Sequence, residues 1–545
     1  MKRTPVKILC ASLAVTATAG TSLIGAGAAT VDFGFTGTKN DKSVSVVNNE
    51  AEGDELPSSY SSRDLGYVTP VKSQIYNSCW AFAGLATFES MLLRMGFEIE
   101  DMSTTHLNLW ATRHSDGTGW LRDVESDGYP VIPIGYLTSW QGGVFQSEVS
   151  DLVLSNTSTA DEIPTDLARF GVTSVKYHYK DQPNEIKRSV MDYGGVYTSF
   201  AHTAACFGTD GVSYYMPPEY SGYYMGHSIE IVGWDDNYPK ESFNGRGSLP
   251  SENGAWLIKN SWGDNNPLGG YFWMSYEDAY VFTQKYTPSY SFTGVEKLDG
   301  TKKLIQNEIY GATYEFEYIN SDNLTFLNRF DFDDDYNVID KITFETKNAG
   351  AKYSLYFVPD GKDNQPESDL TKWTKLYDGT VDYAGYICAD IDDFEYSAAK
   401  GSIAVNIDAS EISSSCSIGV GEWLTAGNDM VFKNKSRHGD SYIMQDGSIR
   451  DLMDWYEINN NDTIGGTFTI KAITAQYYPA TLIGDANLDG VVNINDVTQI
   501  QRHLSEMITL KKTAASNADY NQDGSITIDD CTMIQRFLAE YDDFE

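Results

Sequence analysis

The chain has 545 residues, of which 41% are hydrophobic, and a formal net charge of −38 at pH 7. This length is enough for three or more domains with cores of their own. The acidic balance excludes nucleic-acid binding as a main function, because phosphate contacts require a basic surface. Six cysteines scattered over the chain do not form a disulfide framework, although a Cys388–Cys416 bridge stays open.

The first 55 residues predict export from the cell. Basic residues at the N-terminus precede an apolar run rich in small residues, and residues 26–28 (Ala-Gly-Ala) fit a cleavage site. We therefore expect a signal peptide over residues 1–29, with a membrane anchor as the alternative reading, and no transmembrane segment after cleavage. Residues 30–55 are polar and predict a disordered leader that is too short for a long inhibitory prosegment.

A cysteine at the start of an apolar helix is the most informative feature of the chain. Ser78 precedes Cys79, and the following residues 80–93 are largely apolar, so Ser78 is expected to cap a helix that begins at the cysteine. The positive end of a helix dipole lowers the pKa of a thiol, which favours a nucleophilic thiolate. The alternative is a small cysteine in a core, which is the usual role of a lone cysteine.

Two later segments offer a base and its partner. His227 begins an alternating apolar strand, and Asn260 ends a second apolar strand, with Trp262 two residues later as a shield. Acyl transfer needs a nucleophile, a base, a group that orients the base, and donors for the developing oxyanion. The remaining histidines have no such context, and we interpret them as structural: His106, His114, His178, His202, His438 and His503.

Together these residues make the segment 56–288 resemble a papain-like cysteine peptidase. Gln74 lies five residues before Cys79, and the cysteine precedes His227 by 227 − 79 = 148 residues, within the family's span of roughly 130 to 150. The resemblance implies Cys79 as nucleophile, His227 as base and acid, Asn260 as the orienting group, and an oxyanion hole made by the Gln74 side chain and the Cys79 N–H. It also implies an α+β fold with a helical half and a β-barrel-like half, a protein or peptide substrate, and no cofactor for catalysis.

The resemblance extends to substrate binding, with departures. Gly142 and Gly143 resemble the family's glycine pair, where a substrate strand bonds to the enzyme backbone. Val144 and Phe145 would then line an apolar pocket for the second residue upstream of the cut, with Trp262 also at the substrate.

One departure concerns the loop beside the nucleophile. Tyr76 and Asn77 stand where the family often has Cys-Gly, so the usual disulfide brace of this loop cannot form. Residues 235–253 predict a polar insertion that lengthens a hairpin.

Residues 289–479 predict an antiparallel β-sandwich. Short alternating strands are separated by turn residues, as in the runs 341–346, 353–358, 402–407 and 467–474. Patterning around residues 427–432 and 442–444 resembles the lectin-like sandwich that follows the peptidase in some exported bacterial enzymes. This resemblance implies carbohydrate as a partner, against the alternative that the tyrosines and tryptophans belong to the core and edges.

An internal repeat over residues 480–545 predicts two calcium sites. Residues 485–496 recur as 519–530, at an offset of 519 − 485 = 34. Each loop has oxygen-bearing residues at the ligand positions of an EF-hand and a glycine at position 6, but Asp stands at position 12 where Glu is usual. The expected Ca²⁺ ligands are Asp485, Asn487, Asp489, Val491 (carbonyl), Asn493 and Asp496 in the first loop, and Asp519, Asn521, Asp523, Ser525 (carbonyl), Thr527 and Asp530 in the second.

Each loop leads into one helix, at residues 497–504 and 531–538, with no comparable helix before it. This small all-α arrangement resembles the type I dockerin of cellulosome enzymes, which implies a cohesin module of a scaffoldin as partner. Ile494-Asn495 and Ile528-Asp529, with the exit helices, would contribute to recognition, and the near symmetry favours docking in two orientations.

The sequence therefore predicts a secreted, multimodular cysteine endopeptidase, located outside the cell or at its surface through a cellulosome-like complex. The alternative is a scaffold component that binds peptides or carbohydrate without cleaving them. A complete set of Cys79, His227, Asn260 and Gln74 favours the enzyme, since a binding protein needs none of them as a set.

Overall fold

The computed structural model describes residues 56–539 except for 153, 156–157, 165, 246–247, 283–288, 320, 333–335, 337, 397–399, 413–414, 425–431, 434–435, 446, 455–463, 477–481, 506, 509 and 511–512. The signal peptide predicted over residues 1–29, the leader predicted over 30–55 and most of the pattern at 427–432 lie outside the described residues. No helix in the described part is long and apolar enough to cross a membrane.

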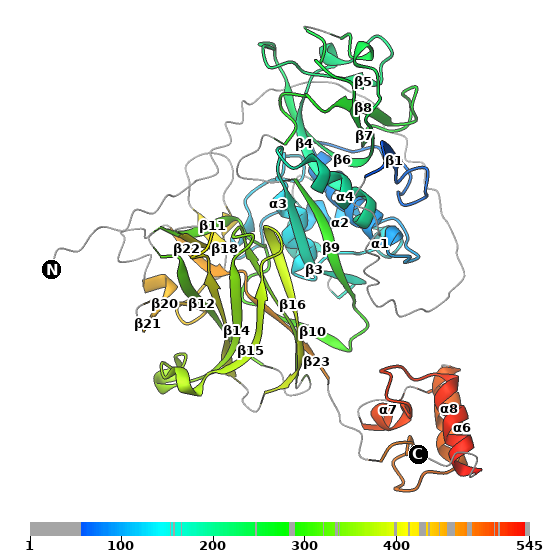
Figure 1. The fold of residues 1–545 in the computed structure, drawn as a ribbon, viewed down its shortest axis with the longest axis vertical. Coiled ribbons are helices and arrows are strands. Elements are labelled where there is room, and N and C mark those ends of the chain that lie inside the picture. The colour runs from blue at the N-terminus through cyan, green and yellow to red at the C-terminus, as the bar shows by residue number, and fades with distance from the viewer. Residues whose placement is uncertain are drawn as a thin grey trace, which may run out of the picture.

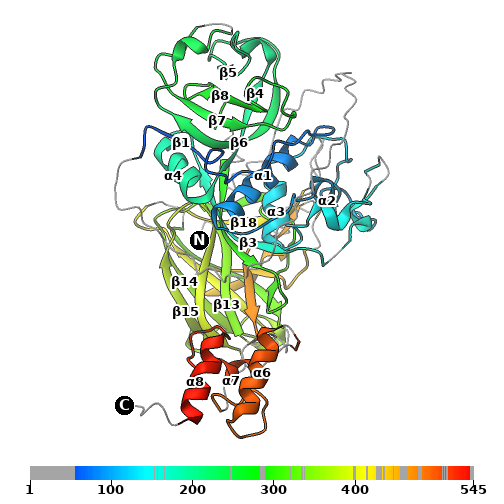
Figure 2. The ribbon, with the colours of Figure 1, turned by 90° about the vertical axis from the view of Figure 1, so that its right-hand side faces the viewer.

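The helical part of the N-terminal domain packs around one long helix (Figure 2). Trp80 and Phe88 on this helix are almost fully buried. Gly84 lets a second helix approach closely, because a Cβ at this position would lie 2.4 Å from Pro133. The helices are α1 (Cys79–Arg94), α2 (Thr104–Trp110), α3 (Val131–Thr138) and α4 (Pro183–Tyr193), with 3₁₀ turns at Gln146–Val149, Ala160–Glu162, Ala204–Cys206 and Lys240–Ser242.

The strands that follow form an open sheet, not the barrel-like half that was expected. In the described part they run in the order β9, β4, β6, β7, β8 and β5. Pairing of β4 with β6 sets Phe200 opposite His227, and β7 on the other side of β6 leads into Asn260. The strands are β1 (Ser59–Ser61), β2 (Gly119–Trp120), β3 (Phe170–His178), β4 (Val196–His202), β5 (Ser213–Tyr214), β6 (Met225–Asp235), β7 (Ala255–Lys259), β8 (Tyr271–Ser275) and β9 (Ser289–Lys297).

This sheet continues into the middle domain (Figure 1). β3 pairs with β16 of the middle domain through Val175 and Tyr386, so that the twelve strands described in this sheet come from both domains. The next residue back, Gly385, has φ +139 and a Cβ there would lie 1.9 Å from the Val175 carbonyl, so the junction needs a glycine. A second connection pairs β2 with β19, Trp120 opposite Phe432. The two domains therefore share hydrogen-bonded backbone.

The middle domain is an antiparallel β-sandwich, as predicted. One layer has the strand order β15, β14, β17, β12, β20 and β21 in the described part, and it faces strands of the shared sheet and the β11–β18 pair. Phe326 and Leu355 from the first layer pack with Ile342, Phe344 and Ile418 from the opposite layer. The strands are β10 (Lys302–Ile305), β11 (Tyr314–Ile319), β12 (Asn323–Asp331), β13 (Val338–Thr346), β14 (Lys352–Pro359), β15 (Thr374–Thr380), β16 (Gly385–Glu395), β17 (Lys400–Asp408), β18 (Ser415–Leu424), β19 (Phe432–Lys433), β20 (Ser441–Gln445), β21 (Ser448–Asp451), β22 (Ile464–Phe468) and β23 (Lys471–Ala475), with 3₁₀ turns at Lys362–Asn364 and Leu370–Lys372.

The C-terminal module is a small helical unit built on the repeat. Each calcium-type loop runs into one helix, and the two helices bury Val497 and Ile500 against Cys531 and Ile534. Its helices are α6 (Ile494–Leu504), α7 (Thr513–Ala518) and α8 (Ile528–Leu538).

Candidate active site

Cys79 is the first residue of α1, and this helix packs against β6, the strand that carries His227. The backbones of Ser228 and Trp80 are among the influences that lower the pKa of the Cys79 thiol, through hydrogen bonding. Since Ser228 follows His227 directly, the fold brings the cysteine beside the histidine strand from 148 residues away.

Ser78 precedes the helix but does not cap it through its side chain, contrary to expectation. Its hydroxyl donates to the Ile75 carbonyl instead. The reason is the backbone at Ser78, whose φ of −102° and ψ of 17° differ from the extended conformation of a side-chain N-cap. The first-turn N–H of Trp80 is consequently available to the thiol.

His227 and Asn260 form the pair that the sequence predicted. His227 Nε2 lies 2.8 Å from Asn260 Oδ1, and the Ser261 backbone N–H donates to the same oxygen at 2.8 Å. Because the Ser261 donor identifies that atom as oxygen, Nε2 must carry the imidazole proton. Nδ1 is then the ring nitrogen that is free to accept a proton.

Three consecutive residues after β7 each position a different part of the site. Asn260 orients the imidazole, Ser261 Oγ donates to Gln74 Oε1 at 2.7 Å, and Trp262 stacks on His227 with ring centroids 4.4 Å apart. The Ser261 bond fixes which end of the Gln74 amide points outward. Gln74 Nε2 donates to the Tyr76 carbonyl at 3.2 Å, and a second N–H of this amide remains for a ligand.

Burial dominates the titration of the two central groups. It raises the pKa of the Cys79 thiol, the Ser228 hydrogen bond opposes this, and the charge of Asp127 adds to it. Burial lowers the pKa of His227 to about 4, opposed by the Asn260 hydrogen bond. The lowering of the thiol pKa expected from the helix dipole is therefore outweighed by desolvation.

A second histidine lies in the site, and sequence reasoning missed it. The ring of His202 packs edge-on against Trp262 at 4.6 Å and lies 6.2 Å from the His227 ring. Burial lowers its pKa to about 4. The signal was available, since His202 ends the strand beside β6, but strand pairing cannot be read from one sequence.

The predicted glycine pair makes its contacts elsewhere. A Cβ at Gly142 would meet Tyr136, and Gly143 packs against Phe170. Val144 is buried and Phe145 packs edge-on to Phe170, so both belong to the helical core.

A different glycine lies against the nucleophile's helix. A Cβ at Gly128 would come within 2.3 Å of the indole of Trp80, the residue after Cys79. The segment 126–130 therefore packs against the side chain of Trp80. The Gly-Tyr-Pro run of residues 128–130 is a sequence signal for a close backbone contact, but the Gly-Gly pair at 142–143 is the stronger glycine motif.

The two repeated loops of the C-terminal module have the same backbone geometry. Gly490 N–H donates to Asp485 Oδ2 at 2.9 Å, and Gly524 N–H donates to Asp519 Oδ2 at 2.8 Å. Leu488 and Gln522 both have φ near +60°. At loop position 12, the carboxylates of Asp496 and Asp530 are fully buried and accept backbone N–H groups.

The chemistry of these loops fits Ca²⁺. Buried carboxylates, amide and hydroxyl oxygens and a backbone carbonyl are the ligands that this ion takes. Among the described residues, no three His, Cys, Asp or Glu side chains are gathered as a closed metal cluster. Several of the expected Ca²⁺ ligands are not His, Cys, Asp or Glu side chains. They are the side-chain oxygens of Asn and Thr residues and backbone carbonyl oxygens.

Comparison with known proteins divides the chain into three parts. Residues 56–290 match the papain family cysteine protease, residues 304–474 the lectin like domain, and residues 483–539 the dockerin type I domain. A solved clostridial cysteine protease, Cwp84 after propeptide cleavage, is 33% identical, covers 77% of this chain and 99% of its own, and superposes with a TM-score of 0.65. The chain belongs to the papain family of cysteine proteases.

A second structure of the same relative gives a consistent result. The cysteine protease and lectin-like domains of Cwp84, a surface layer associated protein of Clostridium difficile, are 32% identical, cover 77% of this chain and 89% of their own, with a TM-score of 0.65. Procathepsin L of Felis catus is 26% identical over 41% of this chain, which spans 61% of that protein's length. The resemblances to a papain-like peptidase, a lectin-like domain and a dockerin are thereby confirmed.

In this papain-family chain a buried arginine braces the segment that packs on Trp80. Cys388 and Cys416 are free, as are the other cysteines of the described part. The Arg122 guanidinium stacks on Trp80 at 4.9 Å, and its Nε and Nη2 donate to the carbonyls of Asp127 and Ser126 at 3.1 and 2.6 Å. Nη1 donates to Asn108 and Ala111 on the α2 side. One side chain thus ties the 126–130 segment to both helices.

Proposed function

We propose that this chain is a secreted cysteine endopeptidase that a calcium-dependent dockerin attaches to a cellulosome-type scaffoldin. The observation that carries the peptidase is the His227–Asn260 hydrogen bond, because it leaves the imidazole Nδ1 unprotonated on the strand beside the Cys79 sulfur. A binding protein gains nothing from an imidazole held in the tautomer of a base.

The proposed reaction begins with proton transfer from Cys79 Sγ to His227 Nδ1. Each charge alone is disfavoured by burial, but the transfer creates a thiolate and an imidazolium side by side, and their attraction compensates for lost hydration. The thiolate attacks the substrate carbonyl, and the imidazolium protonates the leaving amine. Water then hydrolyses the acyl-enzyme, with His227 as base. Stacking of Trp262 on His227 keeps water from the Asn260 hydrogen bond.

The oxyanion would receive hydrogen bonds from Gln74 Nε2 and the Cys79 N–H. Ser261 supports this role, since its bond to Gln74 Oε1 directs the NH₂ end away from the strand. Preorganised donors of this kind are often the largest single contribution to catalysis.

The decisive experiment is hydrolysis of fluorogenic peptides and of an unfolded protein under reducing conditions. Cys79→Ala should lose at least about 10⁴-fold in kcat, because nothing else supplies the nucleophile. Cys206→Ala, a buried thiol of the same domain, is the matched control and should retain activity. Equal activity of wild type and Cys79→Ala would remove the assignment, and a wild type that binds peptides without cleaving them would favour the non-cleaving alternative.

Attachment through the C-terminal module rests on its exposed, duplicated surface. Ile494 and Ile528 occupy the same position in the two loops and are 56% and 58% exposed. The repetition of an exposed isoleucine at equivalent positions supports a duplicated docking surface, and the symmetry supports two docking orientations on a cohesin. Calcium would hold the loops that present them.

Cohesin binding is testable by calorimetry with a recombinant cohesin panel. Binding should require Ca²⁺ and disappear with EDTA. Ile494→Asp and Ile528→Asp should each still bind cohesin in one of the two docking orientations. The double variant should not bind. Calcium-independent binding, or full binding by the double variant, would contradict the proposal.

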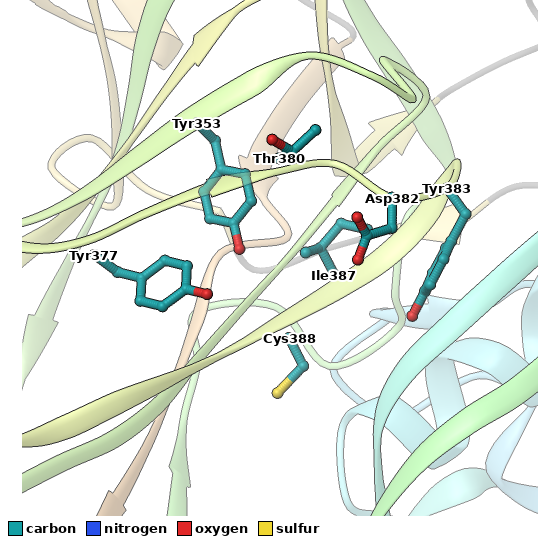
Figure 3. Close-up of a pocket in the computed structure, with 7 residues that line it drawn as sticks. All are labelled: Tyr353, Tyr377, Thr380, Asp382, Tyr383, Ile387 and Cys388. Carbon is teal, nitrogen blue, oxygen red and sulfur yellow. The ribbon is translucent and has the colours of Figure 1, made fainter. Parts of the chain in front are cut away.

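Carbohydrate binding by the lectin-like domain is a second candidate, and one cavity favours it (Figure 3). A polar pocket of about 250 Å³ lies at the β14–β15–β16 edge of the sandwich, a volume suited to one sugar ring. Tyr353 and Tyr377 stack on each other at 5.9 Å and direct their hydroxyls inward, near Asp382. Hydroxyl and carboxylate groups around a small cavity suit a polyol better than an anion.

A glycan array probed with the full chain tests this candidate. Tyr377→Ala should abolish any glycan signal, whereas Tyr356→Ala, on the same strand layer but outside the pocket, should not. A signal that survives Tyr377→Ala would exclude this pocket.

A further inference from the structure

The Trp262 indole is partly open to solvent although it covers His227. The side chain is 40% exposed, and a β-bridge to Ser73 fixes the backbone of the residue. In the described part of the chain, the aromatic contacts of this indole are with two histidines. It stacks on His227 with an interplanar angle of 21°, and it meets His202 edge to face at 73°. An indole with so much surface in water depends on these two rings for its position.

Pairing of β4 with β6 explains why His202 reaches the stack of Trp262 on His227. His202 lies opposite Met225, two residues before His227 on the same face of β6, so the two imidazoles are diagonal neighbours. The three ring centroids are 4.4, 4.6 and 6.2 Å apart, which puts His202 at about a right angle to the line from Trp262 to His227. His202 therefore lies at the side of the indole and opposes its lateral movement off the His227 ring.

The packing around His202 uses its ring as an aromatic group. Nδ1 is buried and has no hydrogen-bond partner within the described residues. The ring packs edge-on to Phe200 and Phe207 instead, with centroids 6.0 and 6.1 Å away. Because a buried nitrogen without a partner costs stability, hydrogen bonding does not explain a histidine here. A phenyl ring should make the same contacts.

We propose that His202 is a positioning residue of the candidate active site, which holds the Trp262 indole over His227. The inference rests on the proposed peptidase function, in which the indole keeps water from the His227–Asn260 hydrogen bond. His202 acts through Trp262 and is not a second base. An aromatic pair shifts an equilibrium by roughly 2- to 12-fold, which sets the size of the expected effect.

A double-mutant cycle on peptide hydrolysis by the full chain tests this role. His202→Ala should lower kcat by about 3- to 10-fold and change KM by less than about twofold, because the ring positions a neighbour of the base and not the substrate. In a Trp262→Ala background the same substitution should cost less than about twofold, since no indole remains to be positioned. Losses that multiply in the double variant would overturn the inference.

Rescue by a ring separates positioning from general stability. His202→Phe should keep kcat within about twofold of wild type, because it keeps the edge-to-face contact. If it lost as much activity as His202→Ala, the packing role would be wrong. His202→Leu, which fills the space without a ring, takes the place of His202→Ala in the cycle if that variant does not fold.

His178→Ala is the matched control, because His178 is a buried histidine of the same domain whose Nε2 lies 3.1 Å from Ser291 Oγ. It should destabilise the fold, but any loss of kcat should be the same with and without Trp262. A loss that depends on Trp262 here as well would remove the special role of His202.

Alkylation of Cys79 by iodoacetamide, followed by mass spectrometry of the intact chain and its peptides, distinguishes this inference from the proposed function. The reaction needs an ionised thiol but no peptide substrate. His202→Ala should slow it several-fold at neutral pH, and His202→Phe should not. Equal rates in wild type and His202→Ala would overturn the inference alone. A wild type that is alkylated but cleaves no peptide would overturn the proposed function, while the rates of the variants would still decide the role of His202.

Discussion

The candidate active site and the candidate calcium loops are both motifs of about half a dozen side chains, but they are assembled in opposite ways. Each calcium loop is a run of twelve residues whose hydrogen bonds stay within the loop, such as Gly490 to Asp485 and Asn493 to Asp496. The active site joins residues from the loop at 74–78, α1, β6 and the turn after β7, across up to 187 positions. A local motif needs only its own residues, whereas a distributed site needs the fold around it.

The comparison predicts that calcium removal affects one region alone. EDTA should unfold the dockerin, because ligand binding at a thousand times Kd contributes about 4 kcal/mol per site. Calorimetry of the full chain should lose or shift one transition, while kcat/KM of the peptidase stays unchanged. If the unfolding transition of the peptidase shifted together with that of the dockerin, the stability of the two regions would not be independent.

The peptidase domain, which holds the distributed site together, should lose stability when a buried ion pair remote from the site is removed. Glu89 on α1 is 1% exposed and accepts from Lys72 Nζ, Thr69 Oγ1 and the Met102 N–H at 2.7, 2.6 and 2.8 Å. Glu89→Ala should cost about 3–5 kcal/mol, because the buried Thr69 and Met102 donors lose their acceptor and Lys72 keeps only Asp101 as a partner. The midpoint of urea unfolding of the peptidase measures this; removing Glu411, which pairs with Lys352 on the surface, should have no measurable effect.

The Glu89–Lys72 ion pair should also make the stability of the peptidase domain depend on pH. Burial raises the pKa of Glu89, but Lys72 and Lys259 outweigh it and hold the pKa below its ordinary value. Its contribution to stability is therefore fully present above the unfolded pKa of about 4.3 and is lost as pH falls through the lower folded value. Wild type should lose stability more steeply than Glu89→Gln below that pH.

A smaller effect is expected at the oxyanion donor. Gln74→Ala should lower kcat about 100-fold with little change in KM, because the donor acts mainly in the transition state. Ser261→Ala should lose about tenfold, since it only orients the Gln74 amide. A change in KM alone for either variant would show that Gln74 binds substrate instead.

The mildest substitution tests the arginine brace. Arg122→Lys keeps the charge but loses the planar fork that reaches five acceptors, so it should raise KM several-fold and cost about 1–3 kcal/mol. Arg169→Lys, at an exposed arginine, is the control. Equal KM values in Arg122→Lys and wild type would show that the 126–130 segment needs no brace.

The sequence predicted those parts of the site that depend on short motifs. Cys79 with Gln74, and the calcium loops, are recognisable because residue order alone fixes their local geometry. Asn260 and His227 were found through their strand contexts, and the structure joins them by a hydrogen bond. The Ser78 cap was wrong because one backbone conformation, invisible in sequence, turns its hydroxyl into the preceding loop.

The contacts of the glycines show the limit of sequence reasoning more clearly. Gly142-Gly143 is the stronger glycine motif, yet Gly128 lies against Trp80. Backbone proximity to an indole depends on how α1, α2 and the intervening loop pack, and no local pattern records that packing. For the same reason neither Arg122 nor His202 was predicted to lie at the site.

By itself, then, the sequence determined the three modules and predicted the candidate nucleophile and the calcium ligands, because helix starts, strand alternation and twelve-residue loops are set by neighbouring residues. Only the tertiary structure decided that β3 and β16 join two modules in one sheet and that Arg122 ties the 126–130 segment to both helices. These features depend on contacts between residues far apart in the chain, and such contacts are fixed by the packing of whole elements.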